Sequence, residues 1–131
     1  MTTERTAIDR ICTDLGLPRG DAYTQDWAYE LPEQFRTEAA LRRYLSAYGN
    51  PAYGDAEHRV LIMLALDIAN DLFEDDEEAG ERACAGIARV LRSRVELHRD
   101  QLERWALEGE PLEDSFALTP WAREQLSGSI K

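Results

Sequence analysis

The most apolar run of the chain, Val60–Leu66, is followed at once by its most acidic segment. Between Asp67 and Glu81 stand eight carboxylates and no basic residue. The apolar run needs burial on nearly all sides, whereas so many like charges need solvent or a cationic partner. The chain must therefore pass from a buried helix into a concentrated negative surface, which constrains both its fold and its function.

Most of the remaining sequence carries apolar residues at the helical period of 3.6. One such stripe lies within residues 3–15 and is stopped by Gly16, and another follows Thr37, which is a suitable N-cap. The expected helices cover residues 3–15, 38–48, 55–73, 78–107 and a short segment that begins at Thr119 and Pro120. The segment Asp21–Leu31 fits a short helix or an irregular stretch. Residues 1–131 are therefore predicted to form one all-α domain, an antiparallel bundle of four to five helices.

Within these helices we expect the core to contain Leu61, Leu64, Ile68, Ile87, Leu91 and Val95. The proposed long helix 78–107 carries its apolar seam at close to heptad spacing. His98 falls in that seam and is expected to be a hydrogen-bonded core residue, whereas His58 stands near a helix start and is expected to be exposed. Cys12 and Cys84 fall at apolar positions and are expected to be buried, reduced thiols.

The net charge is −11, from 26 acidic and 15 basic residues. Such a charge repels nucleic acid and anionic membranes and attracts cationic surfaces, so neither nucleic acid nor membrane is expected as a partner. No signal peptide is recognised near Met1, and the apolar run is too short to span a bilayer. Cytoplasmic residence is expected.

Five of the carboxylates, Asp67, Asp71, Glu74, Glu78 and Glu81, would fall within an arc of about 80° if their helix were unbroken. Like charges at this spacing repel one another, so a stripe of this kind suits a divalent metal or a basic protein surface. The alternative is a solvated helix end. A metal site would use Asp67, Asp71, Glu74 and Glu78, but no calcium-binding loop and no Glu-x-x-His motif supports one, so no metal or cofactor is expected.

No motif for nucleophilic catalysis or phosphate binding is present. The serines lack a Gly-x-Ser-x-Gly elbow, and the only lysine, Lys131, belongs to no P-loop. No catalytic residue is therefore proposed. The chain is expected not to be an enzyme.

Aromatic residues crowd into positions 23–53: Tyr23, Trp27, Tyr29, Phe35, Tyr44, Tyr48 and Tyr53. Most are expected to pack the joint between the first two helices. Tyr and Trp are also favoured as interface anchors, because they bring a large contact area with few rotatable bonds. Trp27 and Tyr29 are the candidates for that role.

The stretch Gln25–Thr37, with the amphipathic helix after it, resembles small bacterial proteins, some of which resemble immunity proteins that accompany polymorphic toxins. The rest of the chain shares their character: small, acidic, helical and cytosolic. The resemblance implies that the protein binds a toxin tightly and thereby neutralises it. Such immunity proteins often bind a basic nuclease through an acidic face of their own. The resemblance carries no functional motif, so no residue role is transferred from it.

These observations favour a non-enzymatic protein-binding domain, most concretely an immunity or inhibitor protein. The partner-binding residues would be Trp27, Tyr29, Asp71, Glu74, Asp75, Glu77 and Glu78. One alternative is a metal-binding or enzymatic bundle that uses the carboxylate quartet. Another is a structural or regulatory homo-oligomer that buries the helical seam, or Trp105 and Trp121, between its subunits.

Overall fold

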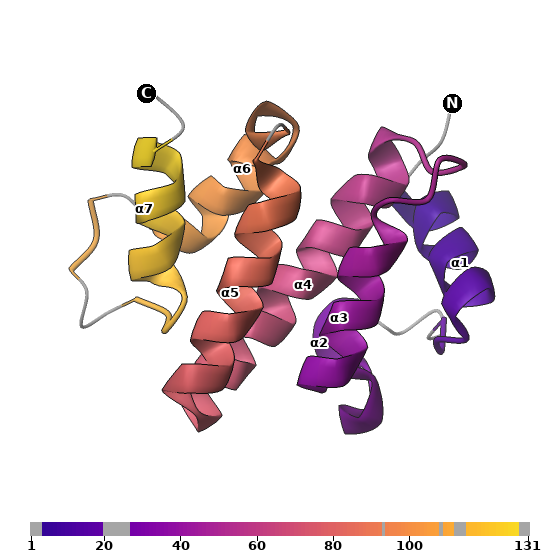
Figure 1. Ribbon diagram of the computed structural model, residues 1–131, viewed down its shortest axis with the longest axis horizontal. Coiled ribbons are helices and arrows are strands. Elements are labelled where there is room, and N and C mark those ends of the chain that lie inside the picture. Colours follow the sequence, from indigo (N-terminus) through magenta and orange to yellow (C-terminus); the bar gives the residue numbers. More distant parts are fainter. Residues whose placement is uncertain (1–3, 20–26, 93, 108, 112–114, 129–131) are drawn as a thin grey trace. The chain divides into compact units, whose positions relative to one another are not determined.

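The computed structural model describes residues 4–19, 27–92, 94–107, 109–111 and 115–128 of the chain. Every regular element in these residues is a helix, which confirms the predicted all-α fold class. The elements (Figure 1) are α1 (Glu4–Leu15), α2 (Trp27–Glu30), the 3-10 helix η1 (Glu33–Phe35), α3 (Glu38–Ala47), α4 (Asp55–Asp75), α5 (Glu77–Leu91), α6 (Val95–Ala106) and α7 (Thr119–Gly128).

The chain divides within α4 into two compact units, Met1–Ile68 and Ala69–Lys131. The first unit holds α1, α2, η1, α3 and the greater part of α4. The second holds the end of α4 together with α5, α6 and α7. That the whole chain forms a single domain stays a prediction.

In the first unit, α1 and α3 form where the sequence predicts them. The stripe of α1 is buried, and Gly16, with a φ of +72°, ends the helix in the left-handed region that glycine tolerates. Thr37 caps α3, because its hydroxyl accepts a hydrogen bond of 3.0 Å from the Ala40 N–H. Of the undecided segment, residues 27–30 form a single helical turn, and residues 21–26 lie outside the described part of the chain.

Helix α4 buries the apolar run as the sequence requires. The side chains of Leu61, Leu64 and Ile68 are fully buried, and in the second unit Ile87 and Leu91 are too. Val95, the sixth predicted core residue, is only half-buried. Neither α4 nor any other helix in the described residues is long and apolar enough to cross a membrane.

The expectation of an exposed His58 is wrong. The side chain is only 9% exposed, because Tyr48 stacks on it with ring centres 4.3 Å apart. Tyr48 follows α3 directly, so the end of α3 covers the start of α4, which no local pattern in the sequence reveals. His98 is fully buried as predicted, with Nδ1 2.7 Å from Oε1 of Gln101.

The single helix predicted over residues 78–107 is also wrong. Helix α5 ends at Leu91 and α6 begins at Val95, with the Arg94 N–H donating to the Leu91 carbonyl in the turn between them. A straight helix of that length would extend for about 45 Å. Its seam would then project past the other helices of a unit this small. No glycine or proline marks the turn, so the sequence signal for it is weak.

Helices α6 and α7 pack against each other in the second unit. The Thr119 hydroxyl donates to the Trp105 carbonyl at 2.7 Å. The Arg123 guanidinium donates from Nε to the Ala106 carbonyl at 2.6 Å and from Nη2 to the Leu107 carbonyl at 2.7 Å. The last carbonyls of a helix have no partner within it, so Arg123 satisfies the end of α6 from α7.

The two cysteines are free and buried, as predicted. Burial raises the pKa of the Cys84 thiol to about 12, and burial is also the main cause that raises the pKa of Cys12. Both thiols are therefore protonated at neutral pH, the unreactive state of a buried cysteine.

Candidate protein-binding surface

Five consecutive carboxylates join α4 to α5: Glu74, Asp75, Asp76, Glu77 and Glu78. All five residues are exposed. We call this segment the acidic tip. Helix α4 ends at Asp75 and α5 begins at Glu77, so Asp76 alone connects the two helices.

Asp76 has an extended backbone and acts as the N-cap of α5, with Oδ1 accepting a hydrogen bond of 3.0 Å from the Glu78 N–H. Glu77 and Glu78 lie in the first turn of α5, where the helix dipole stabilises negative charge. Glu74 and Asp75 lie in the last turn of α4, where the same effect is unfavourable. Two of the five carboxylates of the acidic tip, Glu74 and Asp75, are thus electrostatically unfavourable for the fold itself.

The joint at Asp76 divides the expected stripe of five carboxylates. Asp67, Asp71 and Glu74 lie on α4, whereas Glu78 and Glu81 lie on α5, so the condition of an unbroken helix is not met. Arg36 donates from Nη2 to Oδ1 of Asp67 at 2.6 Å, and both side chains are largely buried, 8% and 17% exposed. Asp67 is therefore part of a structural ion pair.

The described residues contain no group of three or more His, Cys, Asp or Glu side chains placed to hold a metal ion. The proposed quartet of Asp67, Asp71, Glu74 and Glu78 is therefore not assembled into a metal site. Asp71 is half-buried, unlike the five residues of the acidic tip.

The exposed carboxylates from Glu74 to Glu81 have no basic counterpart in the part of the chain that is described. Glu74, Asp75, Glu77, Glu78 and Glu81 make no ion pair with a described arginine. Their mutual repulsion is therefore not compensated by the described residues, and a cationic surface brought to the tip would relieve it.

Gly80 fixes how closely α5 approaches α4 behind the acidic tip. A Cβ atom at Gly80 would lie 2.4 Å from Cγ of Phe73 and 2.7 Å from its Cδ1 and Cδ2 atoms, far inside van der Waals contact. The backbone of α5 therefore lies directly against the ring of Phe73, and only glycine fits there without a shift. The sequence signal was a lone glycine inside a helical pattern.

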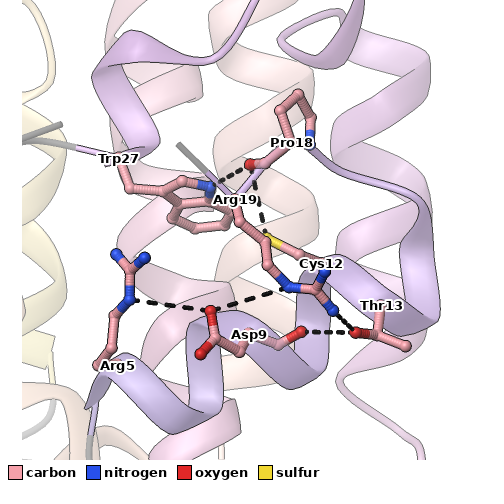
Figure 2. A network of polar contacts seen from close by, with 7 residues as sticks. All are labelled: Arg5, Asp9, Cys12, Thr13, Pro18, Arg19 and Trp27. Carbon is pink, nitrogen blue, oxygen red and sulfur yellow. Dashed lines mark hydrogen bonds and ion pairs between the residues drawn. The ribbon is translucent and has the colours of Figure 1, made fainter. Parts of the chain in front are cut away.

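Trp27, one of the two proposed aromatic anchors, is buried with 6% of its surface exposed. Its indole Nε1–H donates to the Pro18 carbonyl at 2.8 Å, and the Cys12 thiol donates to the same oxygen at 3.6 Å. Figure 2 shows both contacts. This carbonyl lies in the connector after α1, so the indole fastens α2 to α1. We therefore remove Trp27 from the candidate surface.

Polar contacts along the exposed side of α1 continue this network (Figure 2). Asp9 Oδ1 lies 3.8 Å from Arg5 Nε and 3.9 Å from Arg19 Nε. Arg19 also donates to the Thr13 hydroxyl, which in turn donates to the Asp9 carbonyl at 3.0 Å. The connector that receives Trp27 is thus held to α1 through Arg19 as well as through the Pro18 carbonyl.

Tyr29, the second proposed anchor, is 65% exposed on α2 in the first unit. The Arg36 guanidinium carbon lies 5.9 Å from the centre of its ring, and Arg36 is itself held by Asp67 and by the Ala28 carbonyl. A fixed cation beside the ring favours one orientation of an otherwise exposed side chain. Tyr29 therefore stays a candidate anchor.

Phe116 is an exposed aromatic residue that the sequence reasoning missed. Its side chain is 46% exposed just before α7, and its ring meets that of Trp105 edge to face with centres 4.8 Å apart. The available signal was an isolated aromatic residue inside the polar connector Glu113-Asp-Ser-Phe-Ala117.

A shallow, open depression of about 380 Å³ lies in the first unit, lined by Asp14, Leu15, Arg43, Ser46, Ala47, Asn50 and Tyr53. The Tyr53 hydroxyl donates to Oδ2 of Asp14 at 2.7 Å. Burial and this hydrogen bond raise the pKa of Tyr53 to about 12. At neutral pH the phenol is therefore a hydrogen-bond donor, and its role here is to fasten the chain before α4 to α1.

Comparisons of the chain with protein-family models, with curated proteins and with solved structures give no match. The resemblance to immunity-type proteins therefore stays a prediction that rests on the residues alone.

Proposed function

We propose that this protein is a non-enzymatic binding domain that associates with a basic protein through the acidic tip. An immunity or inhibitor role, in which the partner is a toxin, is the most concrete form of the proposal. The observation that carries it is the exposure of five consecutive carboxylates at a helix joint with no described arginine to pair with. The five carboxylates repel one another, and the charges of Glu74 and Asp75 interact unfavourably with the dipole of α4.

A cationic surface would gain from these carboxylates in two ways. Opposite charge raises the rate of diffusional encounter, and it excludes partners of the wrong sign. Asp71, at the base of the tip, adds to this charge. Tyr29, which is exposed in the first unit, is the remaining candidate for a separate aromatic contact, since Trp27 is buried. Exposed aromatic residues contribute mainly through the dissociation rate.

The experiment starts with capture of the partner from the native host on immobilised protein, followed by surface plasmon resonance with the purified partner. The association rate is expected to fall steeply with salt, because the charges are screened beyond about 8–10 Å. The triple variant Glu74→Arg, Asp75→Arg and Glu77→Arg should slow association far more than it speeds dissociation. Tyr29→Ala should act mainly on dissociation.

The matched control reverses three exposed carboxylates that do not belong to the tip: Glu4→Arg, Glu33→Arg and Glu124→Arg. It changes the net charge by the same amount, so a smaller effect on association assigns the steering to the tip rather than to the total charge. A captured partner that binds both triple variants as fast as the wild type, at any salt concentration, would exclude the acidic tip from the interaction.

A further inference from the structure

Phe116 is exposed, yet its backbone is firmly held. Its N–H donates to the Thr119 hydroxyl oxygen at 3.1 Å, and its carbonyl accepts from the Thr119 N–H at 3.1 Å. Thr119 is fully buried and donates its hydroxyl to the Trp105 carbonyl. The ring is thus presented to solvent from a fixed backbone with Trp105 beside it, so its burial by a partner would lose little conformational freedom.

The segment that carries Phe116 lies against α4 one helical turn before the acidic tip. The Leu118 N–H donates to Oδ1 of Asn70 at 3.0 Å, and Asn70 is 8% exposed on α4. Residues four apart share one face of a helix, so Glu74 follows Asn70 on the face that the segment occupies, about 6 Å further along the axis. The segment that carries the exposed ring thus contacts α4 one helical turn before the first carboxylate of the tip, within the same unit.

We infer that Phe116, backed by Trp105, is the apolar contact of a docking surface whose charged part is the acidic tip, and that the surface fits a basic amphipathic protein segment. An apolar side chain of that segment packs on the Phe116 ring, and its arginine or lysine residues face Glu74 and the carboxylates after it. The net charge of −11 argues against a second copy of this chain as the occupant, because like charges would then be brought together. The inference rests on the proposed function, since it takes the acidic tip as the charged part.

The test uses two short synthetic peptides of equal charge, one of alternating arginine and leucine and one with glutamine in place of every leucine. Isothermal titration calorimetry at low salt measures both affinities. The wild type is expected to bind the arginine–leucine peptide more tightly than the glutamine peptide. Phe116→Ala should lower the affinity for the arginine–leucine peptide about tenfold and leave the affinity for the glutamine peptide unchanged. Pro111→Ala removes another exposed apolar side chain from the same unit and should preserve the preference.

Phe116→Leu keeps an apolar group at the position and is expected to retain most of the preference, with circular dichroism confirming that each variant is folded. Equal weakening of both peptides by Phe116→Ala would overturn the inference, because the ring would then not be an apolar contact. Light scattering that finds a dimer dissociated by Phe116→Ala would overturn it too, with a second copy as the occupant.

The outcome also separates this inference from the proposed function. Suppose that the triple charge reversal at the tip lowers the affinity for both peptides but Phe116→Ala lowers neither affinity. The acidic tip then still binds cations, and only the apolar contact is refuted. If the charge reversal has no effect on either peptide, the charged part of the surface is refuted together with the inference that rests on it.

Discussion

Replacing Gly80 by alanine sets two opposing effects against each other beneath the acidic tip. Alanine favours a helix interior over glycine by about 1 kcal/mol. The new Cβ, however, would stand 2.4 Å from Cγ of Phe73, where ordinary contact begins at 3.4 Å, so the ring base must move by about 1 Å. Such overpacking costs about 1–3 kcal/mol. We therefore expect the variant to be less stable by between about zero and 2 kcal/mol.

The assay is urea unfolding followed by circular dichroism for four proteins: the wild type, Gly80→Ala, Phe73→Ala and the double variant. Without the Phe73 ring the Cβ has room, so Gly80→Ala should stabilise the Phe73→Ala background by about 1 kcal/mol. The change of sign gives a coupling energy of about 1–3 kcal/mol between the two positions. Gly54→Ala, where a Cβ would meet no atom within 4 Å, is the control for a glycine with open space around it. An equal stability change at Gly80 in both backgrounds would refute the close approach of α5 to the Phe73 ring.

Three further predictions concern the core, the acidic tip and Tyr53. Leu64→Ala in the buried run of α4 should cost about 2–5 kcal/mol, and a loss below about half a kcal/mol in urea unfolding would refute the helix register. The double variant Glu74→Gln, Asp75→Asn should raise the melting temperature at low salt, whereas Glu77→Gln, Glu78→Gln should lower it. The first pair lies at the C-terminus of α4 and the second at the N-terminus of α5, so the helix dipoles act on them in opposite directions. Shifts of the same sign would contradict this. Because the folded-state pKa of Tyr53 is raised from 10.0 to about 12, the unfolded state loses its proton first, and stability should fall as pH rises from 10 to 12. Tyr53→Phe should flatten this dependence, and a wild type whose unfolding free energy is constant over that range would disprove the shift.

The helices themselves could largely be read from the sequence, because each buries a stripe that repeats at the helical period. Thr37 and Gly16 mark their helix ends through local chemistry that works without tertiary contacts. The turn after Leu91 carries no such mark, since it contains neither glycine nor proline. It forms because a continuous helix would carry its seam away from the rest of the unit.

The candidate surface was less predictable, because exposure depends on what the rest of the chain covers. Trp27 and Tyr29 stand two positions apart in the same aromatic segment, yet the Pro18 carbonyl receives only the first. His58 is buried by Tyr48, which precedes it by ten positions and belongs to another helical segment. The exposed carboxylates of the tip were predictable, since no buried environment could hold five of them in sequence. Phe116 and Gly80 gain their significance only from contacts with Trp105 and Phe73.

The single-residue joint at Asp76 also bears on how the chain folds. Phe73 and Gly80 are seven positions apart, and a contact across so short a loop closes early in folding because little chain entropy is lost. The five carboxylates of the tip are then drawn together before the rest of the core exists, with only dissolved ions to screen them. We expect stopped-flow refolding to quicken with added salt, and this dependence to weaken when Glu74 and Glu77 are changed to Gln; a salt-independent rate would show that the joint closes late. Because of the same carboxylates, added salt would thus have opposite effects on two rates. It would speed the folding of the chain and slow its association with the partner.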